Sequence, residues 1–145
     1  MLVKAEVKKI TRVSRKNVIE YFADPQLYLK THAKYYKSFS VVSKEENVVF
    51  VDEEWEFGNR RLSFTHKITL NLPNRIDLEI IKGDGKGSRE TITFEELSEG
   101  TKVIYISDFK LGGISGKIFG WLAGKQIKKM MEEMAEEDIR YLEAK

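Results

Sequence analysis

The chain has 145 residues, 41% of them apolar and 33% charged, a composition typical of a folded domain rather than a disordered segment. The net charge of +2 gives no electrostatic footprint for nucleic-acid binding, and the absence of cysteine excludes disulfides and thiolate metal sites. No segment has the roughly 18 apolar residues of a membrane span, and the N-terminus lacks the apolar run of a signal peptide. We therefore expect a single cytoplasmic domain over residues 1–145.

The first part of the chain predicts a strand followed by two short helices. Apolar and charged residues alternate over residues 3–13, which is typical of a half-buried strand. Ser14 suits the N-cap of a helix that continues to Asp24. Pro25, whose missing N–H is harmless in the first turn of a helix, then favours a second short helix over residues 26–33.

From residue 37 to the Gly112-Gly113 pair the sequence predicts strands separated by turns. Gly58-Asn59 is a two-residue hairpin turn, and Pro73-Asn74 and Glu99-Gly100 mark later turns. Because strands joined by short turns must run antiparallel, these segments predict one antiparallel sheet. The expected strands cover residues 37–42, 48–57, 62–72, 76–80, 92–94 and 103–111.

The remaining residues, 114–145, predict one amphipathic helix of about eight turns. Its apolar sector contains Phe119, Ala123, Ile127, Met130, Met134 and Tyr141. A sheet with one apolar face needs a cover, and only this helix is long enough to provide it. The predicted fold class is therefore α+β, a helix-grip: a curved antiparallel sheet of about six or seven strands, two short helices after the first strand, and the long C-terminal helix packed across the sheet.

This order of elements resembles the START/SRPBCC superfamily, which includes birch-pollen-allergen-like proteins, polyketide cyclases and dehydrases, and coenzyme Q-binding proteins. The resemblance rests on the element order, on the Phe22-Ala23-Asp24-Pro25 break between the short helices and on the Gly112-Gly113 hinge. It covers essentially the whole chain. It implies an elongated cavity between sheet and helix that accepts lipids, sterols, quinones, polyketides or plant-hormone-like molecules, although one fold hosts many activities.

The hairpin turn also predicts which side chains of its two strands face the apolar side. In this register Phe57 opposes Arg60, Trp55 opposes Leu62 and Val51 opposes His66. The inward set is then Val49, Val51, Glu53, Trp55 and Phe57, facing Leu62, Phe64, His66, Ile68 and Leu70. Glu53 and His66 therefore fall on the apolar side, diagonal to one another.

A row of polar residues crosses this apolar face. Continuing the same phase places Lys82 opposite His66 and Glu90 opposite Lys82. An unpaired polar group there would cost about 1–3 kcal/mol. One interpretation is that the row orients a polar ligand head, with His66 or Glu53 as a proton shuttle. The alternative is that the phase slips at a bulge and that Lys82, Glu53 and Glu90 reach solvent at the rim.

The predicted ligand contacts combine this row with the apolar residues around it. They are Val51, Glu53, Trp55, Phe64, His66, Ile68, Leu78, Ile80, Lys82, Glu90, Phe94, Tyr105, Ser107, Phe119, Ala123, Ile127, Met130 and Met134. We expect no cofactor. His32 is expected at the surface or at an interface, and two histidines far apart in sequence make no metal motif.

The long helix has two unusual features. Gly116, Gly120 and Gly124 recur every four residues, either to leave room for a ligand or to allow close packing against the sheet. Lysines fill its first half and acidic residues its second half, the reverse of what the helix dipole prefers. The residues Ile114, Ile118, Trp121 and Leu122 form an apolar side that could touch a membrane surface, contact a second copy or pack under the short helices.

These observations leave three candidate functions open. The first is binding or carriage of an apolar small molecule such as a lipid, quinone or polyketide-like compound. The second is a polyketide cyclase or dehydratase type of enzyme that uses His66 and Glu53 as acid and base. The third is a module that binds a protein partner in its groove. A monomer or weak dimer is expected, without nucleic acid.

Overall fold

One antiparallel sheet of seven strands forms the body of the computed structural model, which describes residues 2–57, 60–110 and 113–144, apart from the side chains of residues 28, 57, 60 and 113–123. The strands are β1 (Leu2–Thr11), β2 (Tyr36–Glu45), β3 (Val48–Phe57), β4 (Arg60–Asn71), β5 (Arg75–Gly83), β6 (Arg89–Leu97) and β7 (Gly100–Lys110). Their order is β1-β7-β6-β5-β4-β3-β2, and every neighbouring pair is antiparallel. The predicted sheet is confirmed.

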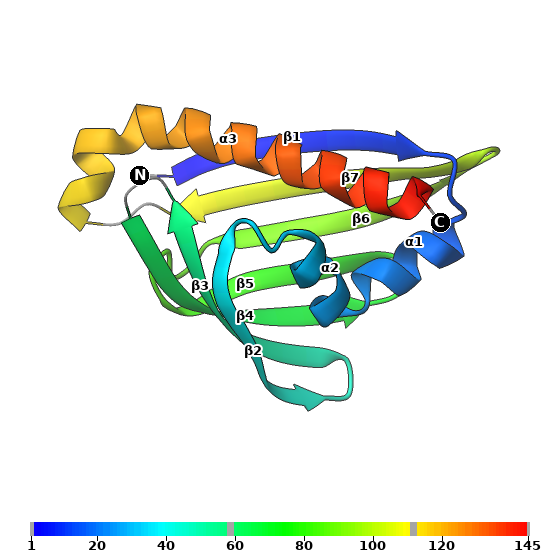
Figure 1. The fold of residues 1–145 in the computed structure, drawn as a ribbon, viewed down its shortest axis with the longest axis horizontal. Helices are drawn as coiled ribbons and strands as arrows, with labels where there is room; N and C mark the ends of the chain where they lie inside the picture. Colours follow the sequence, from blue (N-terminus) through cyan, green and yellow to red (C-terminus); the bar gives the residue numbers. More distant parts are fainter. Residues whose placement is uncertain (1, 58–59, 111–112, 145) are drawn as a thin grey trace.

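The three helices are α1 (Arg15–Phe22), α2 (Pro25–Thr31) and α3 (Gly113–Glu143). The predicted caps are confirmed: the Ser14 side chain accepts a hydrogen bond from the backbone N–H of Asn17, and Asp24 accepts one from Leu27. Figure 1 shows α3 running beside β1 and across the curved sheet, with α1 and α2 on the same side. We call this covered side the inner face. The α+β helix-grip predicted from the order of elements is thus the observed architecture.

The β3–β4 hairpin has the predicted register. Trp55 lies opposite Leu62, Val51 opposite His66 and Phe57 opposite Arg60, while the turn residues Gly58 and Asn59 lie outside the described part of the chain. Glu53 is only 4% exposed, so the odd-numbered residues of β3 do face the interior. Glu53 therefore does not reach solvent at the rim.

The predicted phase fails on β5, where one extra residue forms a bulge. The ladder pairs Thr65 with Lys82 but His66 with Ile80, so residue 81 is the extra one. Lys82 consequently lies on the outer face and is exposed, as the bulge alternative predicted for this residue, and its place opposite His66 is wrong. Gly83 accommodates the close approach of the two strands, since it has a φ of +90° and a Cβ there would lie 2.3 Å from a β4 carbonyl oxygen.

Glu90 also has a different neighbour from the predicted one. It lies opposite Leu78 on β5 and opposite Ser107 on β7, not opposite Lys82. Leu78 and Ser107 are both buried, so Glu90 keeps its predicted place on the inner face even though its partner across β5 is different.

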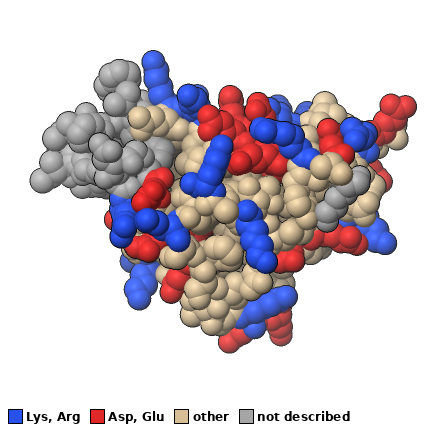
Figure 2. Space-filling view, in the orientation of Figure 1, with Lys and Arg blue, Asp and Glu red and all other residues tan. Residues whose placement is uncertain are grey.

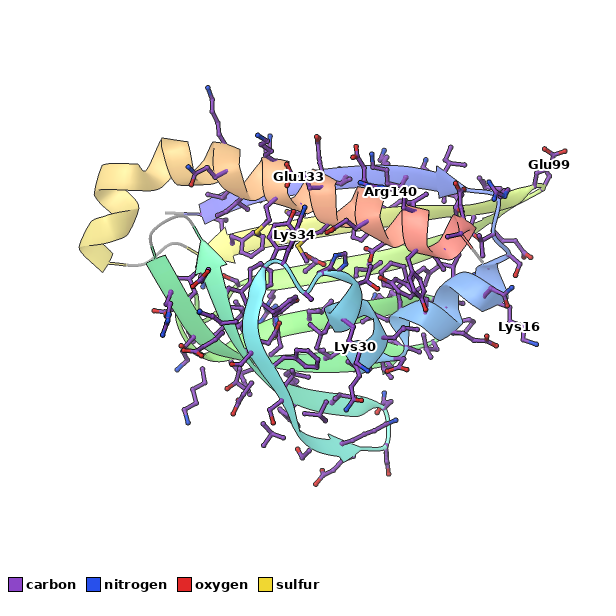
Figure 3. The ribbon with its side chains drawn as sticks, viewed as in Figure 1. Lys16, Lys30, Lys34, Glu99, Glu133 and Arg140 are labelled. Carbon is purple, nitrogen blue, oxygen red and sulfur yellow. The ribbon has the colours of Figure 1, made fainter. Side chains whose placement is uncertain are left out.

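The apolar residues of the inner face form two separate clusters. The larger one lies between the sheet, α1, α2 and the second half of α3, and includes Val51, Ile68, Ile92 and Tyr105. The smaller one consists of Trp55, Phe64, Ile80 and Met130, with Tyr35, Tyr36, Leu62 and Met134 packed against it. Figure 3 shows the side chains that fill the space between helix and sheet. The buried apolar side chains that the structure describes thus fall into two clusters, with Tyr36 packed against both.

Candidate functional site

Polar residues occupy the boundary between the two apolar clusters. On β3, Glu53 lies between Val51 of the larger cluster and Trp55 of the smaller one. On β4, His66 lies between Ile68 of the larger cluster and Phe64 of the smaller one. On β6 and β7, Glu90 and Ser107 pair with one another and are the inward residues next to Ile92 and Tyr105 of the larger cluster. We call Glu53, His66, Glu90 and Ser107 the inner-face cluster.

The first half of the inner-face cluster is a carboxylate–imidazole pair. His66 Nδ1 bonds directly to Glu53 Oε2, and Trp55 Nε1 donates to the other oxygen of Glu53 at 3.3 Å. The ring of Phe64 stands edge-on against the imidazole, with centroids 5.1 Å apart. Both oxygens of Glu53 are thereby satisfied, and the predicted proximity of Glu53 and His66 is confirmed as direct contact.

The second half of the cluster is Glu90 with Ser107. The Ser107 hydroxyl donates to Glu90 Oε2 at 2.9 Å, while Glu90 Oε1 has no hydrogen bond to any residue that the structure describes. Among the described residues, Glu90 is thus an acceptor with only one of its two oxygens paired.

Burial and neighbouring charges set the proton affinities of the cluster. Burial lowers the pKa of His66, but the charge and hydrogen bond of Glu53, with the charge of Glu90, outweigh it and hold the pKa above its ordinary value. Burial raises the pKa of Glu90, and the Ser107 hydrogen bond and the charge of His66 oppose this rise without cancelling it. The charge of each of these two residues thus shifts the pKa of the other across β5.

The cluster is not sealed. The side chain of His66 is 16% exposed, against 1% for its partner Glu53, and Glu90 is half-buried. Both residues nevertheless lie on the inner face of the sheet, and burial is the largest influence on their pKa values.

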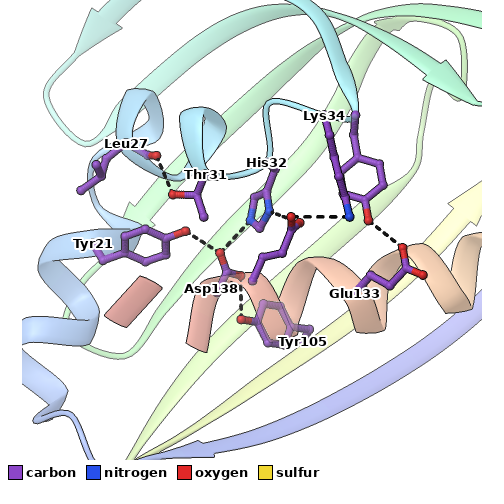
Figure 4. A network of polar contacts seen from close by, with 10 residues as sticks. Tyr21, Leu27, Thr31, His32, Lys34, Tyr105, Glu133 and Asp138 are labelled. Carbon is purple, nitrogen blue, oxygen red and sulfur yellow. Dashed lines mark hydrogen bonds and ion pairs between the residues drawn. The ribbon is translucent and has the colours of Figure 1, made fainter. Parts of the chain in front are cut away.

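A second polar cluster joins α1, α2, β7 and α3, as Figure 4 shows. Asp138 Oδ1 accepts from the Tyr21 hydroxyl at 2.5 Å and binds His32 Nε2 at 2.7 Å, and its Oδ2 accepts from the Tyr105 hydroxyl at 2.8 Å. His32 Nδ1 binds Glu137 Oε1 at 3.1 Å. We call these five residues the clamp cluster, because they tie the short helices to the long one.

Sequence reasoning missed the clamp cluster. His32 is 2% exposed, so its expected place at the surface is wrong, and Asp138 was not recognised as an interior residue. The spacing of residues along α3 could have indicated its position. Asp138 follows Met134 by four residues and Met131 by seven, which places it on the inward side of α3. Tyr105, predicted as a ligand contact, has its hydroxyl occupied by Asp138.

The clamp cluster and its neighbours explain the charge order of α3. Glu133 accepts from the Tyr35 hydroxyl at 2.8 Å, and Glu137 lies 3.7 Å from the Lys34 ammonium. Lys34 and Glu133 lie close to one another in Figure 3, and acidic side chains gather along the second half of α3 in Figure 2. Partners on other elements thus outweigh the few tenths of a kcal/mol, roughly, that the helix dipole would gain from the reverse order.

Other predicted contacts are placed as follows. The buried positions Val51, Ile68, Leu78, Ile80, Phe94, Ile127 and Met130 are inside, and Met134 packs against the smaller apolar cluster. Several predictions concern residues 113–123 of α3, whose side chains lie outside the described part of the chain. They are the ligand contacts Phe119 and Ala123, the glycines Gly116 and Gly120, and the apolar side made of Ile114, Ile118, Trp121 and Leu122. At Gly124 a Cβ would meet Val3 at an ordinary 3.7 Å, so close packing does not demand glycine there. None of the described helices is long and apolar enough to cross a membrane.

Comparison with solved structures finds the same architecture in other proteins. The protein TTHA0849 from Thermus thermophilus is 18% identical, with 97% of each chain covered and a TM-score of 0.87. A START superfamily protein from Mycobacterium smegmatis is 13% identical, with 99% of this chain and 97% of that chain covered and a TM-score of 0.78. The Zhui aromatase/cyclase from a Streptomyces species is 12% identical, with 98% and 92% covered and a TM-score of 0.73. At such low identities, these TM-scores show a shared fold and nothing more.

The sequence itself identifies the family. A comparison with curated protein sequences finds no significant match. Residues 20–136, however, match the model of the family described as polyketide cyclase / dehydrase and lipid transport. That range includes both short helices from Glu20 onward, strands β2 to β7 and most of α3. The chain therefore belongs to the polyketide cyclase/dehydrase and lipid transport family, with the helix-grip fold of START-like proteins.

Proposed function

We propose that this protein binds an apolar small molecule between the inner face of the sheet and α3, with the polar end of that molecule at the inner-face cluster. The observation that carries the proposal is the open polar boundary between the two apolar clusters. His66 keeps 16% of its side-chain surface exposed there, and Glu90 keeps one oxygen without a partner among the described residues.

In a purely structural interior we would expect both groups to be fully paired. Buried polar groups in folded proteins are normally all hydrogen-bonded, and a free one costs about 1–3 kcal/mol. The smaller apolar cluster beside them offers aromatic and methionine side chains, Trp55, Phe64 and Met130, which suit an apolar ligand body of variable shape. The family description, which includes lipid transport, agrees with such a ligand.

Organic extraction of the purified protein followed by mass spectrometry tests the proposal directly. A thermal-shift screen with lipids, quinones and polyketide-like compounds complements it, because a ligand at about 100 times its Kd stabilises the folded state by about 2.7 kcal/mol. We expect stabilisation by at least one apolar class, and a loss of that stabilisation in His66→Leu.

Lys67→Ala is the matched control for His66→Leu, since Lys67 is the next residue of β4 and is exposed. It should leave the thermal shift unchanged. No extracted ligand together with no stabilisation by any compound would overturn the proposal.

The contact between His66 and Glu53 also favours a second candidate, acid–base catalysis of the cyclase or dehydratase type. A carboxylate bonded to an imidazole is a common arrangement for a general base. Incubating the protein with polyketide-like compounds and searching for loss of water by mass spectrometry tests it. Turnover with a bell-shaped pH profile that disappears in His66→Ala would establish this candidate, and unchanged turnover in that variant would remove it.

A further inference from the structure

The turn between α2 and β2, residues 32–35, joins the sheet to α3, and we call it the strap (Figure 4). At its end, the Tyr35 carbonyl accepts from the backbone N–H of Glu56 on β3 at 3.2 Å. The Tyr35 hydroxyl donates to Glu133 on α3 at 2.8 Å. Tyr35 and the following Tyr36 also pack against the smaller apolar cluster, so the strap lies beside the side chains that suit the ligand body.

His32 attaches the other end of the strap to α3, and both of its ring nitrogens face carboxylates. Nε2 lies 2.7 Å from Asp138 Oδ1, and Nδ1 lies 3.1 Å from Glu137 Oε1. An ionised carboxylate only accepts hydrogen bonds, so each ring nitrogen needs a proton to donate. A neutral imidazole has one N–H, and only the positively charged ring has two. The attachment of the strap to α3 therefore depends on a single proton.

The contact with Glu137 is the one that the neutral ring would lose. His32 and Asp138 are buried, whereas the side chain of Glu137 is 18% exposed and also lies 3.7 Å from the Lys34 ammonium. A buried carboxylate without its donor costs more free energy than a partly solvated one, so the remaining proton stays on Nε2. The bare Nδ1 then faces the Glu137 oxygen, lone pair against lone pair.

The titratable groups around His32 come from the elements packed against it. They are Tyr21 of α1, Tyr105 of β7, Glu90 of β6, Lys34 of the strap, and Glu133, Glu137 and Asp138 of α3. Burial lowers the pKa of His32, but Asp138 and Glu137 outweigh it and raise the pKa above its ordinary 6.5. The midpoint at which His32 loses its second proton therefore lies above pH 6.5.

Resting on the proposed function, we propose that the strap is a pH-sensitive gate of the ligand site. While His32 carries both ring protons, the strap is tied to α3 and holds Tyr35 against the smaller apolar cluster. Loss of one proton frees the strap from Glu137 and lets an apolar molecule enter and leave faster. The contact between Tyr35 and Glu133 remains, so the strap loosens without detaching.

The exchange rate of the fluorescent dye Nile red tests the gate. Stopped-flow fluorescence measures its uptake, and displacement of the bound dye by dodecanol, an uncharged competitor, measures its release. NMR of the imidazole locates the pH range in which His32 titrates. We expect both rate constants to rise about tenfold across that range, because the closed strap loses one charge-assisted hydrogen bond.

Two variants should have opposite effects on these rates. His32→Gln has no proton to lose, and its amide oxygen cannot donate to Glu137, so the fast rates should appear at every pH. In Glu137→Gln the amide can accept from a protonated Nδ1 and donate to a bare one, so the slow rates should persist through the titration of His32. A merely structural role of the two residues would make both variants faster.

Glu136→Gln is the matched control for Glu137→Gln. Glu136 is the preceding residue of α3, is exposed and pairs with Lys9, so its rates should follow those of the unaltered protein at every pH. Glu137→Gln also retains His66 and Glu90, so a rise caused by those two residues would persist in it. If His32→Gln does not fold, Glu137→Gln decides.

The outcomes separate the gate from the proposed function. Dye binding with rate constants that stay the same through the titration of His32 would overturn the gate and leave apolar-ligand binding intact. An equal rise in the unaltered protein and in Glu137→Gln would do the same. Failure of Nile red to bind at any pH would overturn both.

Discussion

The two polar clusters inside this protein differ in how completely their groups are paired. In the clamp cluster, both oxygens of Asp138 and both ring nitrogens of His32 have partners, and the two residues are 3% and 2% exposed. In the inner-face cluster, His66 and Glu90 each keep a polar atom without a described partner and remain accessible. Complete pairing is typical of a structural network, whereas the incomplete pairing of the inner-face cluster supports the proposed ligand site.

The largest effect should come from breaking the clamp cluster. In Asp138→Ala three buried donors lose their acceptor, and we expect the free energy of unfolding to fall by about 3–5 kcal/mol. Urea denaturation followed by circular dichroism measures the loss.

Glu136→Ala is the control for Asp138→Ala. Glu136 is exposed and its only described ion pair is with Lys9 at 3.5 Å, so its loss should cost less than about 1 kcal/mol. Equal losses in the two variants would show that the clamp cluster does not stabilise the fold.

Two adjacent methionines of α3 compare the apolar clusters. Met131 belongs to the larger cluster and Met130 to the smaller one, with 7% and 8% exposure. Met131→Ala should cost about 2–5 kcal/mol of unfolding free energy, and Met130→Ala at least about 1 kcal/mol less, because its surroundings adjoin an accessible space.

The affinity for Nile red, an uncharged apolar dye, should depend on the other methionine. Met130→Ala should change it, and Met131→Ala should not, because only Met130 belongs to the cluster beside the proposed ligand site. A larger stability loss in Met130→Ala, with unchanged dye binding, would show that the smaller cluster is ordinary core.

A smaller effect is expected from the pH dependence of the clamp cluster. Burial lowers the pKa of His32, but Asp138 and Glu137 outweigh it and raise the pKa above its ordinary 6.5. The stabilisation by His32 is therefore complete below pH 6.5 and is lost as the pH rises through the folded-state pKa.

His32→Gln should remove this contribution. The difference in unfolding free energy between the unaltered protein and the variant should shrink as the pH rises above the range where His32 is protonated. His66 and Glu90 also have raised pKa values, so their contributions to the unfolding free energy likewise fall as the pH rises. Both proteins contain these two residues, so the comparison cancels their contributions. A difference that stays constant with pH would contradict the assignment of His32 as a protonated clamp residue.

Much of the fold could be predicted from local signals, because short turns and alternating patterns act within a few residues. The Gly58-Asn59 turn predicted the register of β3 and β4, and with it the diagonal placement of Glu53 and His66 on the inner face, where the two are in contact. A bulge was one of the two alternatives left open, but its position at residue 81 could not be predicted, because it depends on how β4 and β5 approach one another at Gly83. That single residue moved Lys82 to the outer face.

The clamp cluster was missed for a different reason. Its members come from α1, from the turn that follows α2, from β7 and from α3, so only the tertiary structure brings Tyr21, His32 and Asp138 together. An Asp among other acidic residues on a helix resembles a solvated face, and its burial depends on donors that lie 117 and 106 residues away in the sequence. Sequence periodicity alone indicates only on which side of α3 Asp138 lies.

The presence of two histidines in the chain, one in each cluster, allows the most direct test of the account. NMR of the imidazole nitrogens during titration with dodecanol reports on both clusters at once. We expect the His66 resonances to shift with the bound fraction while those of His32 stay in place. A shift of His32, or of neither histidine at saturating dodecanol, would contradict the assignment of the inner-face cluster as the binding site.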